Sequence, residues 1–275
     1  MITSWGSLFA GHVDLENIGY DGTPANERSL SDEHLATAFD KAEAIAKLMD
    51  RTGYDTFWAA EHRFQPEGYE CLPNLLMLFV HLAHVTKRLK FGCGFNVAPM
   101  WHPLRLAEDF ATADRLTGGR IIFGVGRGYH SREVETFGNP IIDGDANREL
   151  FEEQIEIIFK AFNDRSFSHH GRHYDIPPRV PYRGYELEEI TLVPRPRTLP
   201  VECWQPLVTG LHFADQRPAA SVHDINLATF ALLKLADGFL HRLAVHAAAI
   251  DAQPGRLGPL VAGQRHVVVP GKHRT

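Results

Sequence analysis

The sequence predicts an α/β fold in which parallel strands are joined by crossover helices. Short apolar runs of strand length alternate with longer amphipathic stretches of helical period up to residue 208. The chain has 275 residues, of which 44% are hydrophobic and 23% are charged, an ordinary globular composition. A β/α barrel takes roughly 250 residues, so the length suits one large domain of this kind.

The first predicted strand covers residues 5–13 and the second covers residues 54–60. A helix is expected between them, with Ser31 or Asp32 as its N-cap and Gly53 at its end. Apolar residues recur along this helix at spacings of three and four, which predicts one buried face. These residues are Leu35, Ala38, Phe39, Ala42, Ile45, Ala46 and Met49.

Two further helix–strand units are expected next. Pro73 is suited to the first turn of a helix that runs to about residue 86, and residues 89–97 form the third predicted strand. His102 and Pro103 start the next helix, which stops at the glycine pair 118–119. The apolar run 121–125 is too short for a helix and suits a strand buried on both faces.

Polar segments separate the remaining elements. Residues 16–29, 129–145 and 164–199 are predicted to be loops, because they are rich in polar, glycine or proline residues. A long amphipathic helix is expected at residues 146–163, and the fifth strand at residues 199–208.

The end of the chain breaks this pattern. Three more β/α units of roughly 30 residues each would not fit after residue 208. Residues 222–252 are rich in Ala and Leu and predict one helical region, and residues 267–269 suit a short strand. We therefore expect a barrel that is incomplete after the fifth strand. The predicted division is a barrel portion at residues 1–210 and an atypical, partly disordered helical tail at residues 211–275.

Composition argues against several classes of protein. The net charge of −6 gives no electrostatic support for nucleic-acid binding. Three widely spaced cysteines without a CxxC pattern argue against a disulfide framework and favour a reducing compartment. The first residues lack the pattern of a signal peptide, and no apolar run reaches the roughly 20 residues of a membrane span. These observations predict a cytoplasmic protein without a membrane segment.

Gly126, Arg127 and Gly128 directly follow the fourth predicted strand. In a β/α barrel, the carboxyl ends of the strands carry the active site. A guanidinium between two glycines combines a fixed positive charge with an accessible backbone, which suits a phosphate group. The alternative is a surface turn with a solvated arginine, and the local sequence does not decide between the two.

Other polar residues also follow predicted strands. Glu61 and His62 end the second strand, and the near-neutral pKa of an imidazole makes His62 the best candidate for acid–base chemistry. Asn96 ends the third strand, where its amide could donate a hydrogen bond to a ligand, and His12 lies near the end of the first. Each has a structural alternative: a histidine bonded within its loop, or an asparagine that turns the chain.

The densest histidine cluster is His169, His170 and His173. It lies in a polar segment without a companion metal-binding motif, so we interpret it as a solvated loop and predict no metal site. No nucleotide-binding or serine-hydrolase motif occurs in the required strand–helix context.

Several of these segments together resemble the bacterial-luciferase-like, flavin-dependent monooxygenases. The matching stretches are GYDTFWAAEHRF at residues 53–64, HPLRLAED at 102–109, TGGRIIFGVGRGYH at 117–130 and ETFG at 135–138. PVECWQP at residues 200–206 is similar to the family's fifth strand. The resemblance covers about residues 1–210, and the tail departs from it as a truncated or frame-shifted product would.

The resemblance implies a TIM-barrel-like fold and a reaction between reduced FMN, O₂ and a small organic substrate. The reduced FMN would come from a separate flavin reductase. His62 matches the family's catalytic histidine, and Arg127, between Gly126 and Gly128, matches the arginine that binds the flavin phosphate. A bulge, often with a non-prolyl cis peptide, would fall at Gly94 and Phe95 and contact the flavin.

The sequence thus favours an FMN-dependent monooxygenase with His62 as catalytic residue, Asn96 beside the cofactor, and Glu61 and His12 in the substrate pocket. One alternative is an oxidoreductase that uses the deazaflavin F420 on the same barrel. Another is a catalytically incompetent homologue, or a partner subunit that pairs with an active one. A homodimer or heterodimer is expected in either case.

Overall fold

The computed structural model describes residues 5–14, 29–208, 230–235 and 266–268. Five parallel strands form the centre of the sheet, each hydrogen-bonded to the next in sequence order. They are β1 (Trp5–Phe9), β2 (Thr56–Ala59), β3 (Lys90–Cys93), β5 (Ile121–Gly126) and β10 (Cys203–Val208). The predicted order of five parallel strands is therefore confirmed.

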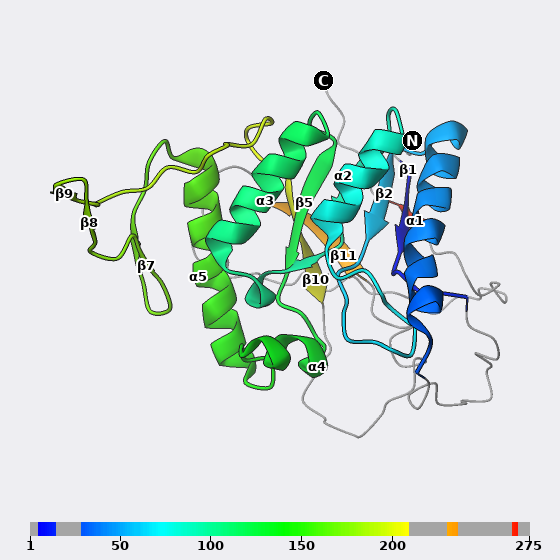
Figure 1. Ribbon diagram of the computed structural model, residues 1–275, viewed down its shortest axis with the longest axis horizontal. Helices are drawn as coiled ribbons and strands as arrows, with labels where there is room; N and C mark the ends of the chain where they lie inside the picture. Colours follow the sequence, from blue (N-terminus) through cyan, green and yellow to red (C-terminus); the bar gives the residue numbers. More distant parts are fainter. Residues whose placement is uncertain (1–4, 15–28, 209–229, 236–265, 269–275) are drawn as a thin grey trace, which may run out of the picture.

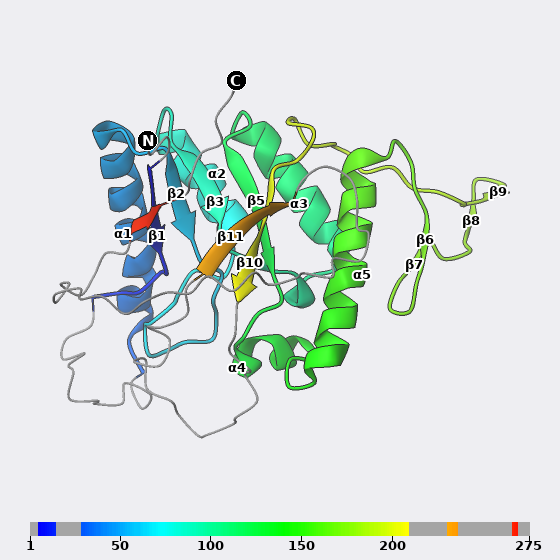
Figure 2. The same ribbon diagram turned by 180° about the vertical axis from the view of Figure 1, so that it is seen from behind.

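Four helices lie together on one face of this sheet, and the strands face the viewer from the other side (Figures 1 and 2). They are α1 (Asp32–Thr52), α2 (Leu75–Val85), α3 (Pro103–Leu116) and α5 (Gly144–Asn163). Helices that all pack on one face of a parallel sheet are the arrangement of one side of a β/α barrel. The face of the sheet that the helices cover is consequently the outer side of the barrel-like sheet.

Local sequence accounts for the ends of these helices. Ser31 and His102 act as N-caps, since each side chain accepts a hydrogen bond from a backbone N–H of the first turn. Gly53 follows α1 with φ +88°, and Gly118 and Gly119 follow α3 with φ +71° and +85°. All three adopt the left-handed conformation that glycine tolerates best.

The third predicted strand is divided. It consists of β3 and a two-residue strand, β4 (Asn96–Val97), which pairs with β5. Between them the Gly94–Phe95 peptide is cis, at the position that the resemblance implied. The 3₁₀ helix η2 (Ala98–Met100) follows and leads into α3.

The prediction of one continuous helix at residues 222–252 is wrong for its middle part. Residues Phe230–Leu235 form strand β11, which pairs antiparallel with β10. Six apolar-rich residues are the length of a strand, and periodicity alone does not separate such a run from a buried helix. The rest of the predicted helix lies outside the described residues.

A short strand near the end of the chain is confirmed as β12 (His266–Val268), which pairs antiparallel with β1. The sheet thus begins with β11 and ends with β12, and among the described strands these two do not pair with each other. The predicted incompleteness of the barrel after residue 210 stays a prediction, because most of residues 209–275 lie outside the described residues.

Two predicted loops contain short regular elements. Residues 129–145 include the helix α4 (Ser131–Val134) and the 3₁₀ helix η3 (Glu135–Phe137). Residues 164–199 form an arm with two small hairpins, seen at the left of Figure 1. These hairpins pair β6 (His169–His170) with β7 (Asp175–Ile176), and β8 (Pro181–Tyr182) with β9 (Tyr185–Glu186).

The prediction of a fully solvated histidine loop is wrong for His169. Its side chain is buried and lies 3.1 Å from a Glu153 carboxylate oxygen. Glu153 also accepts hydrogen bonds from the backbone N–H groups of Arg172, His173 and Tyr174. This carboxylate therefore attaches the arm to α5.

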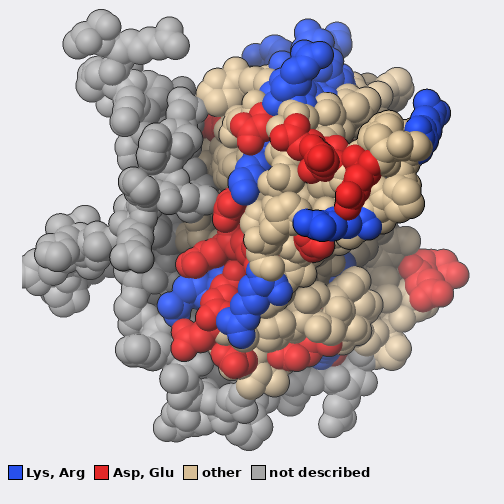
Figure 3. Space-filling view, turned by 90° about the vertical axis from the view of Figure 1, so that its left-hand side faces the viewer, with Lys and Arg blue, Asp and Glu red and all other residues tan. Residues whose placement is uncertain are grey.

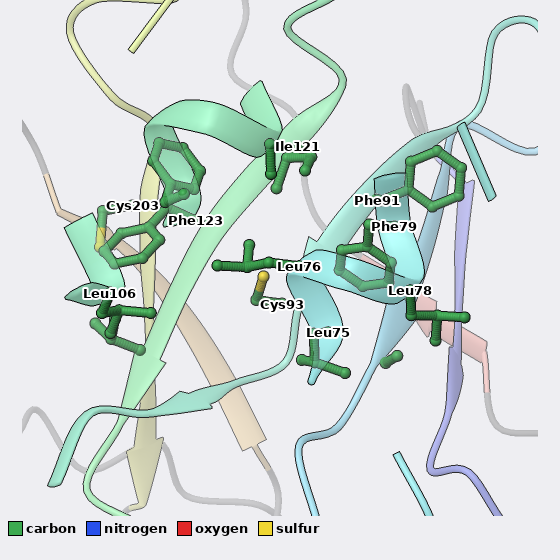
Figure 4. Packing of buried hydrophobic residues seen from close by; sticks show 14 of the residues in the cluster. Leu75, Leu76, Leu78, Phe79, Phe91, Cys93, Leu106, Ile121, Phe123 and Cys203 are labelled. Carbon is green, nitrogen blue, oxygen red and sulfur yellow. The ribbon is translucent and has the colours of Figure 1, made fainter. Parts of the chain in front are cut away.

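The main hydrophobic core fills the space between the sheet and the helices. Figure 4 shows side chains of α2 and α3 beside those of β3, β5 and β10. Three phenylalanines from different elements meet here: the Phe123 ring centroid lies 4.7 Å from that of Phe110 and 5.4 Å from that of Phe162. All three are fully buried or nearly so.

Acidic and basic side chains are interspersed over the face shown in Figure 3. Ion pairs such as Lys160–Glu156 and Arg148–Asp145 link neighbouring turns of α5. Among the described helices, none is long and apolar enough to cross a bilayer.

Replacement of Phe123 by Ala should lower the free energy of unfolding by about 3–5 kcal/mol, because a buried ring is lost and a cavity remains. Denaturant titration of both proteins would measure the difference. Leu116→Ala is the control, since the Leu116 side chain on α3 is 69% exposed and its loss should change stability by less than about 0.5 kcal/mol. Equal effects of the two substitutions would contradict the assigned core.

The carboxylate of Asp50 makes a second contribution to the stability of the fold, and this contribution depends on pH. The carboxylate accepts hydrogen bonds from the backbone N–H groups of Lys87, Arg88 and Leu89 at 2.8–3.0 Å, which ties the end of α1 to the start of β3. Burial opposes ionisation, but these hydrogen bonds outweigh it and lower the pKa of Asp50 below its ordinary value. The folded state therefore favours the ionised carboxylate.

Asp50→Ala should cost about 1–3 kcal/mol at pH 7, as loss of hydrogen bonds to a charged group does. A carboxyl with a lowered pKa stabilises the fold above its unfolded pKa of about 3.9 and loses this contribution as the pH falls through the folded value. The difference in free energy of unfolding between the wild type and Asp50→Ala should stay constant above pH 5 and become smaller below pH 4. Urea titrations across this range test it, with the exposed Asp40→Ala on the same helix as control.

Candidate active site

The polar residues predicted for the site follow three neighbouring strands. His62 follows β2, Asn96 follows β3, and Arg127 follows β5. The three strands are parallel, so all three residues lie at the same edge of the sheet. Helix α4 lies at this edge in both views (Figures 1 and 2). The prediction that the guanidinium and the imidazole share one edge is thus consistent with the strand order.

His62 is held between two partners. Its Nδ1 lies 3.1 Å from Oε1 of Glu133, and its Nε2 lies 3.1 Å from the hydroxyl of Tyr129. An ionised carboxylate only accepts, so the Nδ1–H donates to Glu133 and Nε2 is free to accept from Tyr129. The imidazole is 5% exposed, and its orientation is therefore fixed by protein contacts.

Ionisation of this pair is coupled. Burial favours the neutral imidazole, but the hydrogen bond with Glu133 and the charge of Glu70 outweigh it and raise the pKa of His62. Burial likewise opposes ionisation of Glu133, whereas the bond and charge of His62 lower the pKa of that carboxyl. Near neutral pH, Glu133 is therefore a carboxylate and His62 is able to hold a proton.

Glu133 is itself fixed by the loop after β2. Its Oε1 accepts hydrogen bonds from the backbone N–H of Arg63 at 3.0 Å and from Nε2 of Gln65 at 3.3 Å. Sequence reasoning missed Glu133, because it lies in a segment predicted to be a loop and carries no motif. A buried carboxylate could have been expected as a partner for His62, but the sequence around His62 does not show that this partner is Glu133.

Glu61 lies directly before His62 and is 1% exposed. One oxygen accepts from the backbone N–H of Val97 at 2.6 Å, and the carboxylate also bonds Arg63 and Nε1 of Trp101. Burial raises the pKa of Glu61 to about 7, although Arg63 and the N–H donors oppose the shift. The contacts of Glu61 hold the segment after β3; its predicted role in the substrate pocket stays a prediction.

Asn96 is fully buried, and its Nδ2 donates to the carbonyl of Gly124 at 3.0 Å. Its Oδ1 has no hydrogen-bond partner within the described part of the chain. The amide is thus part of the β4–β5 junction, and one of its two N–H groups is committed to Gly124. The predicted cofactor contact of Asn96 remains a prediction, as do those of Gly94 and Phe95.

Arg127 is exposed at the start of the loop after β5. Its Nη1 donates one long hydrogen bond, 3.4 Å, to the carbonyl of Gly144 at the amino end of α5. Partial burial and the nearby charge of Arg148 lower the pKa of Arg127, but a guanidinium stays charged at neutral pH. Much of its hydrogen-bonding capacity therefore remains for an anion.

The glycine after Arg127 is required by the fold. Gly128 has φ +81°, and a Cβ there would lie 2.8 Å from side-chain atoms of both Val97 and Val134. Gly126 ends β5, where a Cβ would lie 3.4 Å from Cβ of Phe95. These two glycines allow the β5 end, the cis-peptide segment and α4 to approach closely.

Glu70 and His130 lie beside His62. Glu70 Oε1 is 3.5 Å from His62 Nε2, and Glu70 Oε2 is 3.4 Å from His130 Nε2. The His12 ring, after β1, is tilted against that of Phe9 with centroids 5.2 Å apart. The charge of Glu70 acts on the pKa of His12, although burial dominates and lowers that pKa. Sequence reasoning placed His12 here but assigned no role to Glu70 or His130.

Apolar side chains occupy the sheet surface above this edge. Trp58, Ile122 and Trp204 form a separate buried cluster with Phe95, and the two indole rings lie 5.8 Å apart. Gly92 is essential to it, because a Cβ there would lie 2.2 Å from the Trp58 ring. This cluster is separate from the main core between the sheet and the helices.

Comparison with known proteins agrees with this arrangement. A family model described as luciferase-like monooxygenase matches residues 20–271. An uncharacterized protein of Sinorhizobium fredii, y4vJ, is 34% identical over 133 residues, which cover 48% of this chain and 36% of the relative. The oxygenase component of the flavin-dependent trigonelline monooxygenase of Acinetobacter baylyi is 28% identical over 151 residues, covering 55% of this chain and 41% of the relative.

The structure is similar to two solved monooxygenases. RslO1 from Streptomyces bottropensis gives a TM-score of 0.54 at 21% identity, covering 72% of this chain and 51% of that one. The oxygenating constituent of 3,6-diketocamphane monooxygenase from Pseudomonas putida gives 0.53 at 23% identity, covering 68% and 47%. At this identity the likeness concerns the fold.

The chain spans less than half the length of these curated relatives. The family match nevertheless extends over most of it, including the segments that carry His62 and Arg127. By sequence and by fold, the chain belongs to the luciferase-like monooxygenase family.

Proposed function

We propose that this protein is a flavin-dependent monooxygenase that uses reduced FMN and O₂ to oxygenate a small organic substrate. The observation that carries the proposal is the buried imidazole of His62, held by Glu133 on one nitrogen and facing Tyr129 with the other. It lies at the strand edge that also bears Arg127, in a chain of the luciferase-like monooxygenase family.

The residues at this edge fit a flavin phosphate. Arg127 makes one long hydrogen bond to the protein in the described region, and Arg148 on the first turns of α5 brings a second positive charge close to it. Two neighbouring guanidinium groups repel each other, and a phosphate dianion relieves that repulsion while accepting their hydrogen bonds. Asp145 pairs with Arg148 at 3.0 Å and offsets part of this charge.

Bound reduced flavin would supply the electrons that activate O₂. The protein's part is to place a proton correctly: His62 Nε2 is the accessible nitrogen, since Nδ1 is fixed on Glu133. The raised pKa of His62 lets this nitrogen hold a proton near neutral pH, as general acid–base catalysis requires. The hydroxyl of Tyr129, 3.1 Å from Nε2, is placed to pass or receive that proton.

A separate flavin reductase is the proposed partner. The Acinetobacter relative is named as the oxygenase component of its enzyme, which implies a second component. We also propose a cytoplasmic location, because the three cysteines Cys71, Cys93 and Cys203 are free thiols, and a homodimer or heterodimer as the working assembly. Burial raises the pKa of Cys93 and of Cys203 to about 12, so these two thiols are unreactive.

Arg127→Ala should weaken binding of FMN by about 10- to 100-fold, the equivalent of losing about 2 kcal/mol from a charge-assisted contact. Fluorescence titration of the purified protein with FMN measures this, and the same titration with F420 tests the alternative cofactor. Arg105→Ala is a matched control, because Arg105 is an exposed arginine that pairs with Glu108 and Asp109 on α3.

An FMN affinity that is equal in all three proteins would remove Arg127 from the phosphate site. Tighter binding of F420 than of FMN would favour the deazaflavin-dependent alternative. No binding of either cofactor to folded protein would favour the incompetent homologue.

His62→Gln should slow oxygenation by about 10²- to 10⁴-fold, the usual contribution of a general acid or base, and leave FMN binding within a few-fold. The measurement is single-turnover oxidation of protein-bound reduced FMN, followed by its absorbance. His81→Gln, an exposed histidine that pairs with Glu43, is the control and should not change the rate. A wild-type rate for His62→Gln would exclude the imidazole from the chemistry.

A further inference from the structure

His62, Glu70 and His130 come together from three separate places in the sequence. One ligand atom of each lies within 4.8 Å of the others, and this is the single group of three potential metal ligands found in the described part of the chain. His62 follows β2, Glu70 lies in the loop before α2, and His130 directly precedes α4. From the sequence alone no metal site was predicted, since the densest histidine cluster, at residues 169–173, lies elsewhere.

Two separations in this group, each between a histidine and a different oxygen of Glu70, are close to the distance between neighbouring ligand atoms of a metal ion. Bonds of about 2.0–2.2 Å from zinc to imidazole nitrogen or carboxylate oxygen place neighbouring ligand atoms about 3.3–3.6 Å apart. Glu70 Oε1 is 3.5 Å from His62 Nε2, and Glu70 Oε2 is 3.4 Å from His130 Nε2. Both exceed the usual length of an N–H···O hydrogen bond, about 2.7–3.2 Å.

His130 is left without a satisfactory partner in the described structure. Its Nε2 is buried and makes no hydrogen bond of ordinary geometry there; an oxygen of Glu70 lies 3.4 Å from it. The ring centroids of His62 and His130 lie 5.1 Å apart, and the ring planes meet at 81° in an edge-to-face arrangement. An ion between them would satisfy a nitrogen that the protein does not satisfy.

The outer contacts also match those of a metal site. Glu133 accepts from Nδ1 of His62, which leaves Nε2 as the nitrogen available to an ion. A carboxylate behind a ligating histidine is the usual second layer of a zinc site. Gln65 holds both carboxylates in place, through bonds of 3.1 Å to Glu70 and 3.3 Å to Glu133.

We propose that His62, Glu70 and His130 bind one divalent transition-metal ion of the zinc type, with an open fourth position. Two imidazoles and one carboxylate are borderline ligands that suit Zn²⁺, Co²⁺ or Ni²⁺ and disfavour Mg²⁺. The ion enters past Glu70 and His130, whose side chains are 21% and 34% exposed. It replaces the hydrogen bond from Tyr129 to Nε2, and about half of the Tyr129 surface is exposed.

Binding of the ion does not depend on the proposed oxygenation. One consequence does rest on that function: a metal on Nε2 of His62 occupies the nitrogen that would otherwise hold the proton. The ion would then inhibit the enzyme instead of assisting it. Binding is therefore tested without flavin, so that failure of one proposal is distinguishable from failure of the other.

The test uses full-length protein freed of metal with a chelator. Titration with Zn²⁺ in a calorimeter should give one site per chain, and titration with Co²⁺ should give the intense visible absorption of a four-coordinate ion. His130→Gln and Glu70→Gln should each weaken Zn²⁺ binding by at least about 100-fold. Glu133→Gln, which removes only the outer carboxylate charge, should weaken it by about 10- to 100-fold.

His81→Gln is the matched control, since this histidine is exposed and paired with one carboxylate, Glu43. Circular dichroism melts establish that each variant is folded. If His130→Gln does not fold, Glu70→Gln, at a partly exposed residue, tests the site in its place. Affinity for Zn²⁺ that is unchanged in folded His130→Gln and Glu70→Gln would assign the ion to another site and overturn the proposal. So would a Co²⁺ spectrum no stronger than that of the hydrated ion.

Discussion

The hydrogen bond between Nδ1 of His62 and the carboxylate of Glu133 is the contact on which the candidate site depends. It joins two residues 71 positions apart and sets which nitrogen of the imidazole faces outward. The bond exists because β2, β3 and β5 are adjacent and parallel, so the loops after β2 and β5 leave the sheet at one edge. Without this contact the buried imidazole could turn, and neither nitrogen would have a defined direction.

Glu61 and Glu133 show how similar carboxylates acquire different properties on either side of His62. Both are almost completely buried. For Glu61, burial prevails over Arg63 and two N–H donors and raises the pKa to about 7. For Glu133, the adjacent imidazole can become cationic, and its bond and charge lower the pKa below the ordinary value. The two carboxylates differ in their partners. Glu61 holds the backbone after β3, and Glu133 shares a proton with His62.

The sequence was sufficient to predict the parts of the fold that are set locally. Ser31, Gly53 and the glycine pair 118–119 were predicted as helix ends, and all adopt the expected conformations. The placement of Arg127 and His62 at one edge of the sheet followed from the predicted parallel order of the strands that precede them. Glu70 and Glu133 could not be predicted, since their roles arise from contacts between loops. Strand β11 was missed because a short apolar run takes its conformation from the strand it pairs with, here β10.

The loop from Arg127 to Glu133 combines functions that could have been distributed over several strands. Arg127 offers a cation, Tyr129 faces Nε2 of His62, His130 approaches Glu70, and Glu133 holds Nδ1. Gly128 makes this possible, because its left-handed backbone turns the chain where any side chain would strike Val97 and Val134. A single turn therefore couples the Arg127 end of the site, where we propose that a phosphate binds, to its imidazole. Any shift of α4 would move the Arg127 guanidinium, the Tyr129 hydroxyl and the Glu133 carboxylate together. The site should therefore gain or lose its proposed activity as one unit.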